Sequence, residues 1–288
     1  TQRSWHMRHR GLKVRMAVAG TILFGFYAGL VAVFQSLLSL PILVGISVLF
    51  VGIQYKLGKW MALRSIETTE LPEAEFPEIH RRFERLCTEM GIEKPKLLAG
   101  KMGVPNAFAV GRKGAGVVVV SDTLIELLDE DELEGVLAHE LSHIKNRDVI
   151  MMVVGQGIAS MISIAIFWVI ALADDSILAT IVAWIVSTLA QMLVMVFVLA
   201  VSRYREYVAD SDAARYTGNP EALARALAKI SQVGRHDDAP AVENDVSALC
   251  IFGGKRGLLA TLFASHPPIE KRIEKLAPGL TTDSVSLR

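Results

Sequence analysis

The sequence of 288 residues has few cysteines and no net charge. Only Cys87 and Cys250 are present, far apart, which argues against the disulfide framework of a small secreted protein. We therefore interpret both as buried, inert thiols in a reducing compartment. Lys and Arg together number 30, as do Asp and Glu, so no overall basic field would concentrate nucleic acid. Nucleic acid is not an expected partner.

Charged residues are also missing from three long stretches. Residues 16–55, 149–173 and 176–202 contain no Asp, Glu, Lys or Arg, and 52% of the chain is hydrophobic. At about 1.5 Å per residue the first stretch gives about 60 Å of helix, enough to cross a hydrocarbon core of about 30 Å twice, with a turn near Pro41. Each later stretch is long enough for one tilted helix. The sequence thus predicts four transmembrane segments, in hairpins over residues 16–58 and 149–201.

Other interpretations of these stretches exist. A signal peptide would have a hydrophobic region of only about 7–15 residues, far shorter than the first stretch. The two later stretches could form a buried hairpin of a soluble core, because Gln156, Gln191 and several serines could face protein. A four-helix transporter would need charged residues inside its spans, and these stretches have none.

Basic residues flank the predicted spans on one side. Residues 1–15 form a basic leader with five Lys or Arg and no acidic residue, and basic residues also follow the first hairpin and flank the second. The connection between the third and fourth segments carries only two aspartates. By the positive-inside rule both termini lie in the cytoplasm, at the cytoplasmic membrane. Residues 59–148 and 202–288 are then expected to combine into one cytoplasmic domain.

The first soluble region shows helix and strand patterns. A helix is expected around residues 73–90, ending near Gly91, and a second around residues 130–146. Asp129 is placed to cap the second helix, with Glu132 at the capping-box position. Short apolar runs separated by Gly and Pro predict a small sheet, with strands at residues 96–99, 107–110 and 117–120.

The second predicted helix carries the sequence His139-Glu140-Leu141-Ser142-His143. A spacing of four places both imidazoles on one helix face, where they can bind one metal ion. Glu140 adjoins the first ligand and can act as general base toward a water that the metal activates. Two surface histidines on an ordinary helix would give the same pattern.

A catalytic zinc usually takes three protein ligands, so a further carboxylate or imidazole is required. Glu206 is the candidate, and Asp210, four residues later on the same predicted helix face, could orient a ligating histidine. Alternatively, Glu206 and Asp210 could be an ordinary pair of exposed acidic residues. Two like charges four residues apart on a helix repel each other, however. Because His143 and Glu206 adjoin the two ends of one predicted membrane hairpin, an antiparallel arrangement would bring them together.

These motifs together resemble the HtpX family of integral-membrane zinc metalloproteases over nearly the whole chain. Residues 131–143 resemble its active-site helix, Glu206 with Asp210 its third-ligand segment, and residues 105–109 and 266–272 two further motifs. The resemblance implies a mainly α membrane protein with four transmembrane helices and a cytoplasmic zincin-like α+β metalloprotease domain containing a small sheet. The CAAX prenyl endopeptidases are more distant relatives, with more membrane segments.

The resemblance also implies roles for single residues. His139, His143 and Glu206 would bind one Zn²⁺ per chain, with Glu140 as the catalytic base. By the same analogy the remaining site residues are Asn106 and Ala107 on a strand that binds extended substrate, His266 as an oxyanion donor, and Arg272 as a brace for Glu206. Asn106 could instead be a turn former after Pro105, His266 a helix N-terminal residue, and Arg272 a solvated side chain.

The function implied is zinc-dependent cleavage of misfolded or damaged membrane proteins at the cytoplasmic face, in membrane protein quality control and stress response. Expected partners are membrane-protein or peptide substrates and the lipid bilayer; the sequence does not define an oligomeric state. A CAAX-type prenyl-protein endopeptidase would require a prenylated C-terminal cysteine. A noncatalytic membrane adaptor with structural zinc would close its metal site with four protein ligands.

Overall fold

The structure is a computed structural model that describes residues 40–64, 66–111, 114–234 and 266–285, together with residues 21, 24, 25 and 28. The predicted leader, most of the predicted first membrane segment and Cys250 lie outside the described residues. The chain divides into two compact units, which are described one at a time. The first comprises Thr1–Leu57 and Met151–Tyr204, and the second Gly58–Ile150 and Arg205–Arg288.

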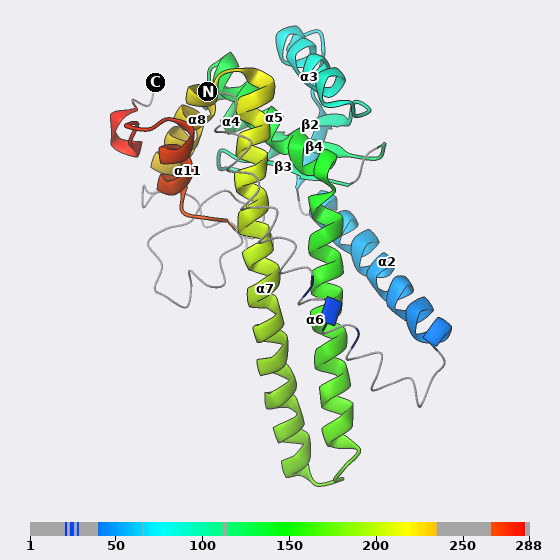
Figure 1. Ribbon diagram of the computed structural model, residues 1–288. Helices are drawn as coiled ribbons and strands as arrows, with labels where there is room; N and C mark the ends of the chain where they lie inside the picture. Colours follow the sequence, from blue (N-terminus) through cyan, green and yellow to red (C-terminus); the bar gives the residue numbers. More distant parts are fainter. Residues whose placement is uncertain are drawn as a thin grey trace. The chain divides into compact units, whose positions relative to one another are not determined.

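Long apolar helices make up the described part of the first unit. They belong to α2 (Leu40–Arg64), α6 (Asp148–Ala171) and α7 (Ile177–Thr217), labelled in Figure 1. Within the described residues, α6 and α7 are long and apolar enough to cross a membrane. Large apolar side chains on them point outward, with Trp168 53%, Leu178 70% and Trp184 65% exposed. Such exposure is typical of helices surrounded by lipid.

The predicted total of four spans stays a prediction. Helix α2 covers the predicted second segment and has Pro41 in its first turn, a position that proline tolerates well. Glycines allow close approach inside this unit: a Cβ atom on Gly157 would lie 2.8 Å from Val51, and one on Gly155 would lie 3.0 Å from Val198. Small residues at helix contacts are characteristic of packing between membrane helices.

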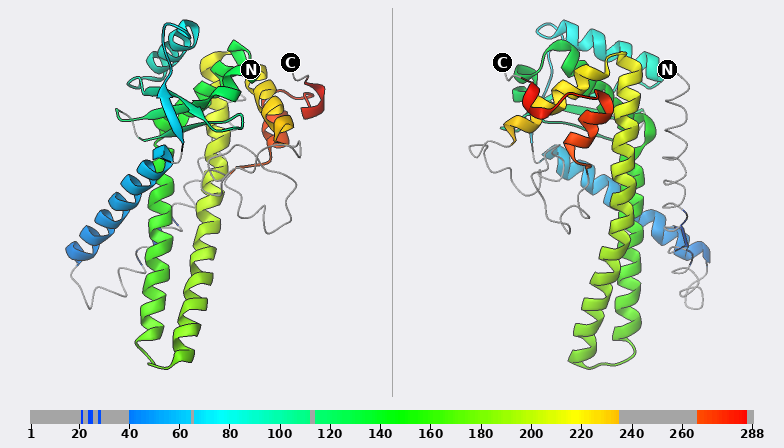
Figure 2. Two further views of the ribbon diagram at one scale, coloured as in Figure 1. Left: turned by 180° about the vertical axis from the view of Figure 1, so that it is seen from behind. Right: turned by 60° about the vertical axis from the view of Figure 1, so that its left-hand side comes forward.

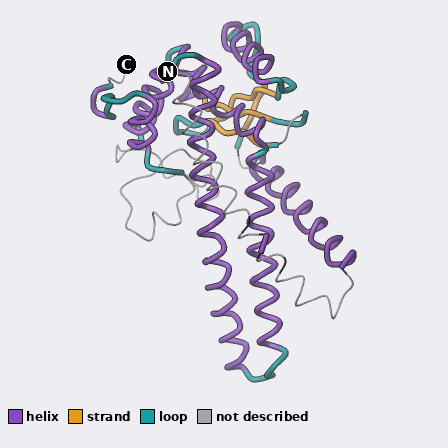
Figure 3. Tube along the Cα trace, viewed as in Figure 1, coloured by secondary structure: helices purple, strands orange, loops and turns teal. Residues whose placement is uncertain are grey.

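The second unit contains a four-stranded mixed sheet, drawn in orange in Figure 3. Its order is β1-β2-β4-β3; β2 and β4 are parallel, and the edge strands β1 and β3 pair antiparallel with them. The three predicted strands are confirmed, two of them slightly longer than expected. The sequence analysis missed β1. The strands are β1 (Glu67–Glu70), β2 (Lys96–Lys101), β3 (Ala107–Val110) and β4 (Val117–Ser121).

Helices cover this sheet. Helix α3 (Pro77–Met90) ends at Gly91, as predicted, with a left-handed φ of 65°. It begins at Pro77 rather than at Glu73, because proline favours the first helical position and disfavours helical backbone in the residue before it. The remaining elements are α4 (Asp122–Leu127), α5 (Glu130–Asn146), α8 (Pro220–Val233), α11 (Ile269–Leu276) and the 3₁₀ turn η1 (Thr282–Ser284).

Helix α5 has the predicted bounds and lies at the centre of this unit. The side chain of Asp129 accepts from the Glu132 amide, and the Glu132 carboxylate accepts from the Asp129 amide, so the predicted capping box is confirmed. Helix α5 contacts α3, β3 and α8, and α11 packs on α8 (Figure 2). The main core joins these elements through buried side chains that include Phe83, Leu86, Val118, Leu137, Leu141, Leu227 and Ile273.

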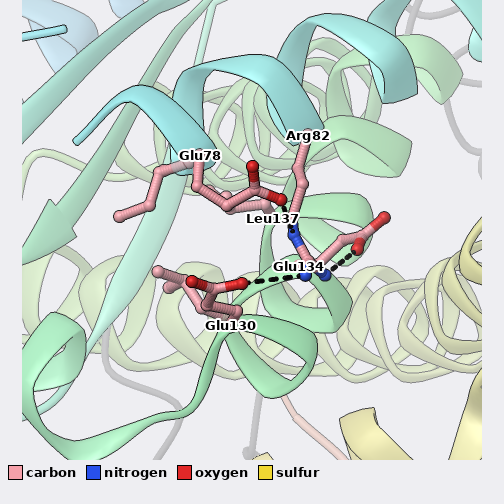
Figure 4. Close-up of a pocket in the computed structure, with 7 residues that line it drawn as sticks. Glu78, Arg82, Glu130, Glu134 and Leu137 are labelled. Carbon is pink, nitrogen blue, oxygen red and sulfur yellow. Dashed lines mark hydrogen bonds and ion pairs between the residues drawn. The ribbon is translucent and has the colours of Figure 1, made fainter.

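Ion pairs tie α5 to its neighbours. Arg82 of α3 donates to Glu78, Glu130 and the buried Glu134 (Figure 4). These residues surround a small pocket that Leu133 and Leu137 also line. On the α8 side, Lys229 Nζ donates to Glu132 Oε2 at 2.7 Å, and both side chains are buried. These contacts hold the helix that carries the two site histidines. Cys87 on α3 is buried as expected, and burial raises the pKa of its thiol to about 11.

Candidate metal centre

The two histidines of α5 face one another. His139 and His143 are one helical turn apart, their ring planes are nearly perpendicular at 88°, and their Nε2 atoms lie 3.1 Å apart. His139 is buried and His143 is mostly buried, with 15% of its side chain exposed. The spacing therefore does bring two imidazole nitrogens to one point, as the sequence predicts.

Glu206 of α7 reaches the same point. Its Oε1 atom lies 3.4 Å from His143 Nε2, and its Oε2 atom lies 3.6 Å from His139 Nε2. One ligand atom from each of these three residues lies within 4.8 Å of the others. Two imidazole nitrogens and a carboxylate oxygen form a donor set that zinc takes in catalytic sites. The residues present thus fit the implied metal.

Asp210 and Arg272 support this cluster. The Oδ1 atom of Asp210 lies 3.0 Å from His139 Nδ1, so Asp210 contacts the ring on the side away from His143. Arg272 of α11, only 2% exposed, donates to both oxygens of Asp210 at 2.6 and 2.9 Å. Its Nη1 atom also lies 3.2 Å from Glu206 Oε2. Arg272 therefore braces the carboxylates of both Asp210 and Glu206.

His266 and Glu140 complete the cluster. His266 Nδ1 lies 3.1 Å from Glu206 Oε2, and the His266 side chain is 27% exposed. Glu140 is buried beside both histidines, and burial raises the pKa of its carboxyl although the two imidazoles oppose this. A carboxyl with a raised pKa holds a proton more readily than an ordinary carboxyl, which suits a group that accepts a proton and passes it on.

The pKa of Glu206 and the pKa values of the two histidines are shifted in opposite directions. Burial alone would raise the pKa of Glu206, but His266 and Arg272 outweigh it and hold that pKa well below its usual value. Burial would lower the pKa of both His139 and His143, yet their carboxylate partners raise it overall, most strongly for His143. A proton and a metal ion therefore compete for these imidazoles.

Asn106 and Ala107 lie at the start of β3, the edge strand that packs on α5. Both are buried, and Asn106 exchanges hydrogen bonds with Ser121, whose hydroxyl accepts from the Asn106 amide and whose amide donates to the Asn106 carbonyl, each at 2.9 Å. This pairing fixes the backbone where β3 begins. The substrate-binding role of the two residues stays a prediction.

The sequence analysis missed two residues at this site, Asp148 and Arg205. Asp148 Oδ2 lies 2.7 Å from His143 Nδ1, and Arg205 donates to the other oxygen of Asp148. Only their positions in the sequence could have indicated this role. Both are charged residues that lie at the end of an apolar stretch and close to a predicted ligand. In the sequence, Arg205 is one of the basic residues that flank the second predicted hairpin and indicate membrane orientation.

The chain is similar to known proteins in sequence and in fold. Residues 73–278 match Peptidase family M48. A Protease HtpX homolog from Halobacterium salinarum is 50% identical over 291 residues, covering 91% of this chain and 99% of that protein. A Protease HtpX homolog from Pyrococcus abyssi is 42% identical over 216 residues, covering 71% of this chain and 74% of that protein. The crystal structure of S. mikatae Ste24p shares the fold with a TM-score of 0.60 at 19% identity, covering 96% of this chain and 67% of that one.

Proposed function

This chain belongs to peptidase family M48 as an HtpX-type membrane metalloprotease, and from that membership we propose that His139, His143 and Glu206 hold one zinc ion per chain for peptide hydrolysis. The observation that carries the proposal is the approach of three ligand atoms to within 4.8 Å of one another. A second observation supports the proposal. Each imidazole contacts a carboxylate through Nδ1, so its Nε2 atom stays free to bind a metal ion in the cluster.

Glu140 is the general base in this proposal. When bound, zinc polarises a carbonyl and lowers the pKa of water, which makes hydrolysis feasible at neutral pH. Glu140 takes the proton from the attacking water and passes it to the leaving amine nitrogen. Its burial supports this role, because the raised pKa of its carboxyl lets the protonated form exist between the two transfers.

His266 acts on the charge that develops in the reaction, and Arg272 positions the carboxylates of the metal centre. His266 contacts Glu206 through Nδ1, and as an imidazolium, with hydrogen on both ring nitrogens, it donates from Nε2 to a substrate oxyanion. Arg272 holds Glu206 and Asp210 in position from below the cluster, without touching substrate. The partial exposure of His266, in contrast to the full burial of Arg272, supports this division of roles.

Extended peptide would bind at β3. An edge strand offers backbone groups to which a further strand can add, and β3 is the edge that packs on α5. Asn106 directly precedes this strand and Ala107 begins it, and the pairing of Asn106 with Ser121 would keep its position fixed. We further propose unfolded segments of membrane proteins as substrates, because extended chain is what an edge strand accepts.

The proposed setting is the cytoplasmic face of the cytoplasmic membrane. Basic residues flank the apolar part of α6 and α7, and the charge-free stretch 149–173 begins directly after Asp148. In this arrangement residues 59–148 and 202–288 form the protease domain, and residues 16–58 and 149–201 form two membrane hairpins. The apolar surfaces of α6 and α7 support the second hairpin.

Replacement of Glu140 by glutamine tests the mechanism. Glu140→Gln keeps the size of the side chain but removes the base, so the full-length protein in detergent should retain zinc and lose about 10²- to 10⁴-fold in cleavage rate. Glu134→Gln is the matched control, because Glu134 is also a buried glutamate of α5 but pairs with Arg82 and Arg85. It should cleave at the wild-type rate.

Three other results would change the proposal. Wild-type cleavage by zinc-loaded Glu140→Gln would favour the adaptor with structural zinc. Zinc loss from a folded Glu140→Gln would make Glu140 a ligand. Cleavage restricted to peptides with a prenylated C-terminal cysteine would favour the prenyl-protein endopeptidase over a protease for unmodified membrane proteins.

A further inference from the structure

Asp148 contacts both His143 and Arg205 beside the metal centre. Its Oδ2 atom lies 2.7 Å from His143 Nδ1, and its Oδ1 atom accepts from Arg205 Nη2. Arg205 also donates to the carbonyl of Asn146, the last residue of α5, at 2.6 Å. Asp148 and Arg205 are both buried, at 6% and 8% exposed. A buried ion pair thus ends on an imidazole of the metal centre.

The same arrangement occurs at the other histidine. His139 Nδ1 contacts Asp210, and Arg272 donates to both oxygens of Asp210. Each histidine therefore has an aspartate at Nδ1 and an arginine behind that aspartate, from different parts of the chain. In both cases the arginine compensates the buried charge of the aspartate. Without this partner, burial of the charged carboxylate would destabilise the fold. The contact of Asp210 with a ligating histidine was expected from the sequence, whereas the pairing of Arg272 with Asp210 and the contact of Asp148 with His143 were not.

We propose that Asp148 is the positioning carboxylate of His143 and that Arg205 decides which way Asp148 presents its oxygens. This inference rests on the proposed metal centre. A carboxylate at Nδ1 accepts the ring proton there and so directs the Nε2 lone pair toward His139 and Glu206. The Arg205 guanidinium can only donate, so it needs an acceptor oxygen at the position of Asp148 Oδ1. It would therefore also fix the orientation of an asparagine side chain placed at position 148.

This geometry makes an unusual prediction for Asp148→Asn. Arg205 has only N–H donors and would hold the amide oxygen, so the amide NH₂ would face His143 Nδ1. That contact selects the ring tautomer with hydrogen on Nε2, which cannot bind metal. Asp148→Asn should therefore weaken zinc binding by about 10- to 100-fold, at least as much as Asp148→Ala. Adding Arg205→Met should restore part of the affinity, because the amide can then turn its oxygen to His143.

The measurement is zinc affinity of the purified full-length protein in detergent, by competition with a chromophoric chelator. The visible absorption of the Co²⁺-substituted protein reports coordination, which a purely structural role of Asp148 would leave unchanged. Thermal unfolding monitors the fold. Asp212→Asn is the matched control, because Asp212 also links α7 to α5 but contacts Ser142 and Asn146. It should keep the wild-type zinc affinity and cobalt spectrum.

The outcomes separate this inference from the proposed function. A wild-type protein that binds no zinc would overturn the metal centre and the inference together. Tight zinc binding by the wild type, with an unchanged affinity and cobalt spectrum in folded Asp148→Asn and Asp148→Ala, would overturn the inference alone. The inference would also be wrong if Asp212→Asn weakened zinc binding as much as Asp148→Asn, or if Arg205→Met gave no recovery in the double variant.

Discussion

His139 Nδ1 lies 3.0 Å from Asp210 Oδ1, whereas Glu206 contributes a ligand atom directly to the cluster. Glu206 and Asp210 of α7 should therefore differ in their effect on zinc. Glu206→Ala removes one of three protein ligands and should abolish tight binding, while Asp210→Ala should weaken it by about 10- to 100-fold. Zinc content after dialysis against a chelator measures both. Full zinc retention by Glu206→Ala would exclude it as a ligand.

Zinc affinity should fall as pH falls. The pKa values of His139 and His143 are raised by their carboxylate partners, so in the metal-free protein both rings hold protons to higher pH than an ordinary histidine. Only the neutral rings bind zinc, so binding releases protons below these raised pKa values and strengthens as pH rises through them. Calorimetry in buffers of different ionisation enthalpy counts the protons. Proton-independent binding across pH 6 to 8, about the range where histidine charge normally changes, would contradict the assignment.

The buried pair of Glu132 and Lys229 should matter for stability. Lys229→Met leaves the Glu132 carboxylate, 1% exposed, with Arg225 at 3.3 Å as its remaining cationic partner. Removing one member of a buried ion pair costs about 3–5 kcal/mol, and we expect the lower end because Arg225 remains. Glu132→Gln combined with Lys229→Met should cost less, since the amide oxygen can still cap α5. Denaturant unfolding tests this, and equal losses would contradict it.

Membrane orientation can be tested with single cysteines. In a background with Cys87 and Cys250 replaced by serine, a cysteine at Asp174, in the connection between α6 and α7, should be labelled from outside intact cells. A cysteine at the exposed Lys96 on β2 should be labelled only after the cells are opened. Labelling of both positions from the same side would contradict the proposed membrane hairpin of α6 and α7.

Local signals made much of the protease unit predictable. The bounds of α5 follow from its acidic first turn and from apolar residues at helical spacing, so the two histidines could be placed on one face. Strand β4 is a run of four valines before Ser121 and was equally clear. Strand β1 has the sequence Glu-Thr-Thr-Glu and becomes a strand only through pairing with β2, which no local pattern reveals.

The partners of the site depended on distant contacts. Asp210 could be inferred because it lies one turn after Glu206 on one helix, and its contact is with His139, more than sixty residues earlier. Asp148 and Arg205 were visible in the sequence only as charges at the ends of apolar stretches. Their contact depends on how α6 begins and α7 continues beside α5, which is set by tertiary packing.

Arg147 is the single residue between α5 and α6, and it has a left-handed φ of 58°. Most connections between helices tolerate changes in length because they lie on the surface. One inserted residue here would turn Asp148 by about 100° around the helix axis and shift it by about 1.5 Å, away from His143. We therefore expect insertions and deletions between Asn146 and Asp148 to weaken metal binding at least as much as Asp148→Ala does, although substitutions at Arg147 by asparagine or glycine should leave it unchanged.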